Sequence, residues 1–139
     1  MSAGLKPLET TQIDINLKIA SAFDGMGVSY FICGSTASSL YGFARSAMAV
    51  DFVAELHTTD APRLVTELGD EFYAVESAIR DAIAERRSFI VIHLDSMLKI
   101  DAFVLKQDRF SREQMARRKL VPVSAPPAPE IYFASPEDT

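Results

Sequence analysis

Residues 29–56, SYFICGSTASSLYGFARSAMAVDFVAEL, carry the pattern on which the predicted architecture rests. An apolar run at residues 29–33 ends in a Gly-Ser pair, and a second apolar run occupies residues 50–56. Glycine permits a sharp turn after a strand, and residues 36–41, which precede a further glycine, favour a short helix. We therefore predict a strand, a tight turn, a short helix and a second strand.

The flanking sequence alternates between helical and extended patterns. Apolar residues recur at helical spacing between positions 13 and 23, before glycines at 25 and 27. Further helices are predicted at residues 59–68, 78–86 and 111–119, the second with Ser77 as its cap, and strands at residues 72–75, 88–94, 98–105, 121–123 and 131–133, with a hairpin turn at 95–97. This order predicts one α/β (α+β) domain, residues 1–139, in which helices flank a mixed β-sheet.

The composition of the chain limits the classes of protein that it can represent. Of its 139 residues 48% are hydrophobic, which is enough for one buried core. No apolar run approaches the roughly 18 residues of a membrane span. The single cysteine, Cys33, excludes an internal disulfide, and a net charge of -5 argues against indiscriminate nucleic-acid binding. We expect a cytoplasmic protein with no membrane association.

Two segments near the C-terminal end carry separate signals. Basic residues crowd positions 109–119, and we interpret them as a solvated helix face, with a local nucleic-acid-binding patch as the alternative. Residues 134–138, ASPED, have the form of a helix start, with a cap residue, a proline and two acids. From this ending we expect a chain truncated at its C-terminal end, whose uncovered apolar face is shared with another molecule, as in a homodimer.

Two aspartates interrupt runs that are otherwise apolar. Side-chain alternation places Asp51 and Asp101 on the strand faces opposite their apolar neighbours. A buried carboxylate is costly unless it is paired or bound to a metal ion. On neighbouring strands the two carboxylates should lie within about 4–6 Å of each other and could share one Mg²⁺ ion. The alternative is that each pairs separately with a basic residue such as Arg45 or Lys99.

The turn at Gly34 and Ser35 is the other candidate part of a site. Glycine lets a ligand approach the backbone closely, and the free N–H groups at the start of the following helix suit a phosphate group. Taken alone, such a turn is more commonly a simple connection between a strand and a helix. It gains weight from the order of the motifs, because strands bearing aspartates follow it.

In this order the motifs resemble those of the nucleotidyltransferase superfamily, which includes polymerase β and small bacterial proteins linked with toxin–antitoxin or phage-defence modules. Its members run an apolar strand into Gly-Gly or Gly-Ser, then a short helix, a Gly-x-Pro-Arg-x-Thr-x-Asp-x-Asp segment and a third aspartate on a neighbouring strand. Here YFICGS (30–35), GFARSAMAVD (42–51) and KID (99–101) match the three parts, with Cys33 where glycine is usual. The resemblance implies a minimal nucleotidyltransferase fold.

The same resemblance implies roles for individual residues. Asp51 and Asp101 would be the metal-binding and catalytic carboxylates. Gly34, Ser35 and Arg45 would contact a nucleoside triphosphate. The implied cofactor is Mg²⁺, or Mn²⁺, and the implied reaction is transfer of a nucleoside monophosphate to an RNA or protein acceptor.

Ala49 departs from the family pattern, because it stands where the first aspartate of the Asp-x-Asp pair is expected. Ala47 likewise stands where threonine is common. Loss of one bridging carboxylate should weaken metal binding and impair transfer. The alternative function is therefore a catalytically silent nucleotide-binding or regulatory module that acts with a partner protein. A further alternative is an interaction domain whose acids satisfy buried arginines.

Two other residues have weaker claims to a role. We interpret His93 as a sheet-face histidine, although the neighbouring strand of Asp101 leaves a catalytic role open. We interpret Cys33 as a small buried hydrophobe rather than a nucleophile, because no base lies near it in the sequence.

Overall fold

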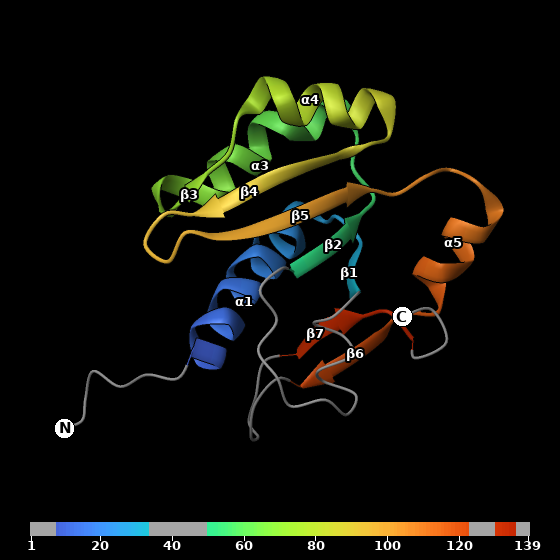
Figure 1. Ribbon diagram of the computed structural model, residues 1–139. Coiled ribbons are helices and arrows are strands. Elements are labelled where there is room, and N and C mark those ends of the chain that lie inside the picture. The colour runs from blue at the N-terminus through green and yellow to red at the C-terminus, as the bar shows by residue number, and fades with distance from the viewer. Residues whose placement is uncertain (1–7, 34–49, 123–129, 136–139) are drawn as a thin grey trace.

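The computed structural model describes residues 8–33, 50–122 and 130–135. Within these ranges the chain forms, in order, α1 (Leu8–Met26), β1 (Tyr30–Cys33), β2 (Val50–Ala54), α3 (Ala61–Leu68), β3 (Phe72–Tyr73), α4 (Glu76–Glu85), β4 (Ser88–His93), β5 (Leu98–Val104), α5 (Arg109–Ala116), β6 (Lys119–Pro122) and β7 (Glu130–Phe133), with short 3-10 turns η1 (Thr58–Asp60) and η2 (Gly69–Glu71). The predicted α/β class, a mixed sheet flanked by helices, is confirmed (Figure 1). The helix predicted at residues 36–41 and the helix-like ending at 136–138 lie outside the described residues.

The described strands form one sheet in the order β3-β4-β5-β2-β1-β7-β6. β2 is parallel to β5 and β1 is parallel to β7, whereas the other neighbouring pairs are antiparallel. The predicted hairpin turn joins β4 to β5 and places Met97 in a left-handed conformation, with φ 59°. A parallel pair such as β2 and β5 needs a long connection, here formed by α3, β3, α4 and β4.

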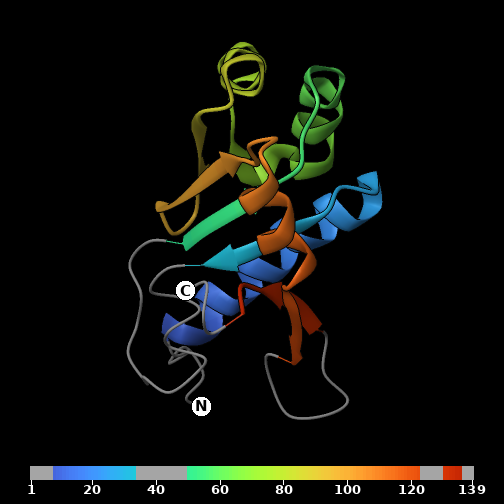
Figure 2. The ribbon, with the colours of Figure 1, turned by 90° about the vertical axis from the view of Figure 1, so that its right-hand side faces the viewer.

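One face of the sheet forms the main core. Ile32, Phe52 and Ala102 are buried on this face. Phe52 packs against Phe23 of α1 and Tyr30 of β1, with ring centroids 5.8 and 5.9 Å away. Helices α1, α3 and α4 contribute buried side chains to the same cluster. Figure 1 shows α3 behind the strands, and in Figure 2 α3 lies to the right of them while α1 runs behind β1.

The opposite face of the sheet is covered only in part. Met115 of α5 packs with Phe31 and Leu105 in a separate cluster near β1. Along β4 and β5 the same face leaves Ile90 and Phe103 exposed, at 48% and 43%. An open area therefore remains on the strands beside α5.

Several predicted helix boundaries are wrong by a few residues. α5 begins at position 109 rather than 111, because the Asp108 side chain accepts a hydrogen bond of 2.7 Å from the Ser111 backbone N–H. It ends before position 119, because Lys119 begins β6 and pairs with β7. α4 begins at position 76, with Val75 rather than Ser77 at its N-cap.

Candidate functional site

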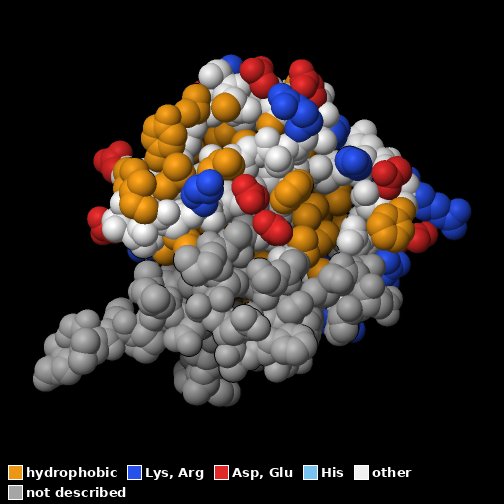
Figure 3. Space-filling model, viewed as in Figure 1, with side chains coloured by type: hydrophobic (Ala, Val, Ile, Leu, Met, Phe, Trp, Pro, Cys, Tyr) orange, Lys and Arg blue, Asp and Glu red, His pale blue; other side chains and the backbone are white. Residues whose placement is uncertain are grey.

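The two candidate aspartates are direct neighbours in the sheet. Asp51 of β2 and Asp101 of β5 are Cα partners in the parallel register, so their side chains leave the same face from strands about 4.8 Å apart. The predicted alternation is confirmed, since Phe52 and Ile100 are buried on the other face. The expected carboxylate separation of about 4–6 Å stays a prediction. Figure 3 shows acidic side chains at the centre of this face, with hydrophobic side chains on either side.

The surroundings of Asp51 oppose its ionisation. Burial raises the pKa of Asp51 above its ordinary value of 3.8, and the charge of Asp101 raises it further. Neither carboxylate forms an ion pair with a basic residue in the described ranges. Lys99 shares their face of the sheet but does not pair with them, and Arg45 lies outside the described residues. Adjacent carboxylates without a basic partner favour a bound cation.

Cys33 continues the row of the two aspartates across the sheet. It is the Cα partner of Asp51 on the antiparallel side, at the end of β1. Burial, together with the charge of Asp51, raises the pKa of the Cys33 thiol to about 11, so the thiol is protonated at neutral pH. It also packs against the cluster of Met115 and Phe31. These contacts support the interpretation of Cys33 as a packed residue rather than a nucleophile.

The described residues contain only part of the site that the resemblance implies. Gly34, Ser35, Arg45 and Ala49 lie outside the described residues, although Gly34 directly follows β1, whose last residue lies beside Asp51. In the described ranges no three His, Cys, Asp or Glu side chains form a group that could hold a metal ion. Two carboxylates can hold a hard cation such as Mg²⁺ when water and ligand phosphates complete the coordination.

His93 cannot act with Asp101, because it lies on the opposite face of the sheet. Its side chain is buried and meets the Phe72 ring edge-on, with centroids 5.2 Å apart. Its Nε2 lies 2.9 Å from Glu71 Oε2, and its Nδ1 lies 2.9 Å from Ser96 Oγ. These bonds tie the β4–β5 turn to η2, so the interpretation of His93 as a structural residue is supported.

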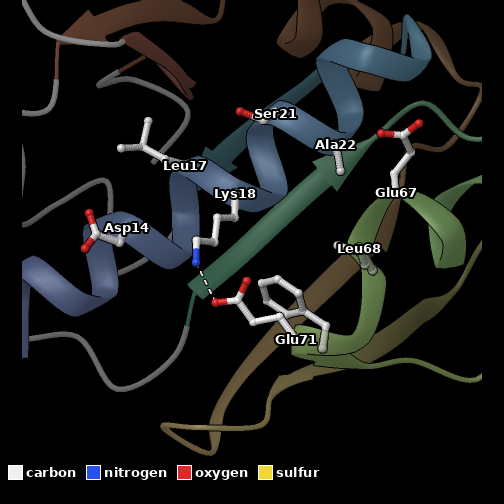
Figure 4. Close-up of a pocket in the computed structure, with 9 residues that line it drawn as sticks. Asp14, Leu17, Lys18, Ser21, Ala22, Glu67, Leu68 and Glu71 are labelled. Carbon is white, nitrogen blue, oxygen red and sulfur yellow. Dashed lines mark hydrogen bonds and ion pairs between the residues drawn. The ribbon is translucent and has the colours of Figure 1, made fainter.

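A cavity of about 510 Å³ lies on the helical side of the sheet, between α1, α3 and η2. Lys18 Nζ contacts Glu71 Oε2 there at 2.5 Å, and Figure 4 shows the Lys18 side chain extending from α1 toward Glu71. Glu71 also bonds to His93, and these partners lower its pKa. Lys18 and Glu71 therefore satisfy each other in this cavity, and the sheet separates the cavity from the aspartates.

Two further cavities lie near the aspartates. One, of about 470 Å³, lies between α4 and β4, and both Ile90 and Asp101 line it. The other, of about 490 Å³, lies between the sheet and α5, and its lining includes Phe103 and Lys106. Arg87 lines both. The sequence did not predict these cavities, because their walls depend on where α4 and α5 dock. The one available signal was that strand alternation places Phe103 on the same face as Asp101.

The basic residues at positions 109–119 are largely held by local contacts. Arg109 Nε contacts Glu113 Oε2 at 3.1 Å, one helical turn away. The Arg118 guanidinium stacks on the Tyr132 ring, 4.0 Å from its centroid. The Arg109 contact supports the interpretation of a solvated helix face, whereas Arg118 lies beyond the end of α5 and packs against β7.

None of the described helices has the length and apolar character of a membrane-spanning helix. No protein-family profile matches the chain, and no curated protein matches its sequence.

Proposed function

We propose that this protein is a metal-dependent nucleotidyltransferase, weakened by Ala49, that transfers a nucleoside monophosphate from a nucleoside triphosphate to an RNA or protein acceptor. The observation that carries the proposal is the pairing of Asp51 with Asp101 across two parallel strands. Burial and mutual repulsion raise the pKa of Asp51. Such an arrangement costs stability unless a cation binds to it.

The donor atoms of this pair fit one hard divalent cation. Carboxylate oxygens are preferred ligands of Mg²⁺ and Mn²⁺, and a site with two of them leaves coordination positions for water and phosphate oxygens. When bound, the ion would offset the charge of the triphosphate and polarise its phosphoryl oxygens. Asp51 and Asp101 would hold this ion, and both side chains are partly exposed.

The polypeptide supplies the binding and orientation of the substrates in this proposal. The backbone N–H groups of Gly34 and Ser35 bind the phosphates, and Arg45 pairs with them. The acceptor hydroxyl oxygen forms a bond to the α-phosphorus while the bond to the β-phosphate oxygen breaks. Pyrophosphate leaves, and the hydroxyl proton passes to solvent. In the family pattern an aspartate at position 49 would supply a third carboxylate. This chain has alanine there, so transfer should be slow.

A second candidate function is a catalytically silent nucleotide-binding or regulatory module that acts with a partner protein. The open area of the sheet favours this candidate, because Ile90 and Phe103 are exposed there and exposed apolar patches mark partner surfaces. The two candidates differ in one respect. Restoring the carboxylate at position 49 should restore transfer in a weakened enzyme but not in a silent module.

The variant Ala49→Asp tests the proposal. In calorimetric titration with Mg²⁺ and a non-hydrolysable nucleoside triphosphate, it should bind nucleotide more tightly than the unchanged chain, because it supplies a third anionic ligand. With an α-³²P-labelled triphosphate it should label an acceptor in a mixture of RNA and protein.

The matched control combines Ala49→Asp with Asp101→Asn, which restores the net charge of the unchanged chain. This control should bind nucleotide no better than that chain. Gain of nucleotide binding without transfer would favour the silent module. If Ala49→Asp gains neither metal nor nucleotide binding, the proposal is wrong.

A further inference from the structure

The cavity between the sheet and α5 begins one residue row from the aspartate pair. We call it the α5 groove; Val53, Phe103, Arg87, Lys106 and Ser111 are among its lining residues. Val53 and Phe103 are Cα partners in the β2–β5 register, two positions after the aspartates on the same strands. They therefore share the face of the aspartates and lie about 7 Å further along it.

The α5 groove has a positive lining in a chain of net charge -5. Its charged lining residues are Arg86, Arg87 and Lys106, with no acid among them. Arg87 forms an ion pair with Glu85, with Nε and Oε1 2.7 Å apart. Both side chains are more than half exposed, at 62% and 63%, and such exposed pairs are weak. Lys106 is exposed and forms no ion pair within the described ranges. The cavities between α1 and α3 and between α4 and β4 both include acids.

Phe103 gives the α5 groove an aromatic surface beside these cations. It is 43% exposed although it lies within a strand. Single-stranded nucleic acids bind to surfaces of this kind, because bases stack on the ring while cations hold the phosphates. An acidic peptide would use the cations but would gain little from the ring. The lining therefore favours RNA over protein as the acceptor.

We propose that the α5 groove binds the single-stranded end of an RNA acceptor, with a base against Phe103 and phosphates against Arg87 and Lys106. This inference rests on the proposed function, because the transfer reaction requires an acceptor hydroxyl beside Asp51 and Asp101. The groove lies close enough to that pair for a terminal nucleotide to span the gap. The net negative charge of the whole chain disfavours RNA binding over the remaining surface.

The test measures fluorescence anisotropy of a labelled oligouridine of about ten nucleotides with the full chain, in EDTA and without nucleotide. Lys106→Glu should weaken binding roughly tenfold and reduce the slope of log affinity against log salt by about one. Phe103→Ala should also weaken binding roughly tenfold, because a stacked base is lost. Circular dichroism checks that each variant is folded.

Two matched controls lie outside the groove lining. Arg63→Glu makes the same change in net charge on α3, and Phe110→Ala removes another exposed aromatic ring, 63% exposed, from α5. Both should bind RNA like the unchanged chain. If Lys106→Glu behaves like Arg63→Glu, or if no RNA binds, the inference is overturned. Transfer to a protein acceptor that is insensitive to Lys106→Glu would also overturn it.

Failure of the inference can be separated from failure of the proposed function. In one outcome RNA binding depends on Lys106 and Phe103, but Ala49→Asp gains no nucleotide binding. This outcome supports RNA binding in the α5 groove and contradicts the proposed transferase function. Nucleotide binding by Ala49→Asp, without groove-dependent RNA binding, contradicts the groove alone.

Discussion

At the scale of single residues, Asp51 lies where a carboxylate has few favourable partners among the residues that the structure describes. It has an acid, Asp101, on one side and a half-buried thiol, Cys33, on the other. Burial and the neighbouring charge both raise its pKa. A raised carboxylate pKa of this kind is a feature of functional sites, where a cation or a substrate makes the compensating interaction.

Asp51→Asn should stabilise the metal-free protein at neutral pH, by less than about 1 kcal/mol for a partly exposed charge. Because the folded pKa of Asp51 is raised, its contribution to stability is fully present below the unfolded value of 3.8. That contribution is lost as the pH rises through the folded pKa. Urea unfolding should therefore show the advantage of the variant at neutral pH and no advantage below pH 3.8. An equal advantage at both pH values would point to packing instead.

The face on which each aspartate lies could be predicted from the sequence, because strand alternation is a local property. Their pairing could not, because the β2–β5 register depends on the packing of residues far apart in the chain. His93 illustrates the same limit. Its strand was predictable, but its position opposite Asp101 follows from the pairing of β4 with β5.

At the scale of elements, the two faces of the central strands differ in burial: one face packs in the main core and the other is partly open. Phe52→Ala should destabilise the protein by about 3–5 kcal/mol, because Phe52 is fully buried between Phe23 and Tyr30. The matched change Phe103→Ala, on the open face of the adjacent strand, should cost less than about 1 kcal/mol. Chemical denaturation measures both. Similar losses for the two variants would contradict the assignment of the faces.

Met97 and Arg86 both have positive φ, so substituting each by glycine distinguishes the cost of backbone strain from the contribution of side-chain contacts. Met97→Gly should stabilise the β4–β5 turn by about 0.5–1 kcal/mol, because Met97 is exposed and glycine adopts its conformation freely. Arg86→Gly should instead destabilise by about 1 kcal/mol, since the Arg86 side chain donates to the carbonyl of Leu105 at 3.2 Å. Thermal unfolding compares them, and a gain in both would mean that the Arg86 contacts contribute little.

Most elements were predictable from periodicity, but several of their ends were not. The helix predicted to reach position 119 ends earlier, because residues from Lys119 onward satisfy their backbone groups in β6. Helical propensity is a weak influence where a sheet edge offers hydrogen bonds. The start of the same helix was missed because the Asp108 side chain accepts from the Ser111 backbone N–H and so begins α5 before the predicted position 111.

At the scale of the whole molecule, the sheet order brings distant segments of the chain to one place. β1, β2 and β5 carry Cys33, Asp51 and Asp101 side by side, although β5 follows two helices and two strands after β2. The order of helical and extended patterns predicted one α/β domain, but it could not predict the order of the strands in the sheet, which requires long-range pairing. The α5 groove arises at the same scale, from the docking of α5 beside the pair.

The most direct test of the shared carboxylate site is a titration of the chain with Mn²⁺, followed by the paramagnetic resonance signal of the free ion, in the presence of a non-hydrolysable nucleoside triphosphate. The unchanged chain should bind the ion weakly, Ala49→Asp should bind it at least about tenfold more tightly, and Asp101→Asn should reduce binding to the level of the nucleotide alone. Mn²⁺ binding that is the same in Asp101→Asn as in the unchanged chain would contradict the assignment of Asp51 and Asp101 as a metal site.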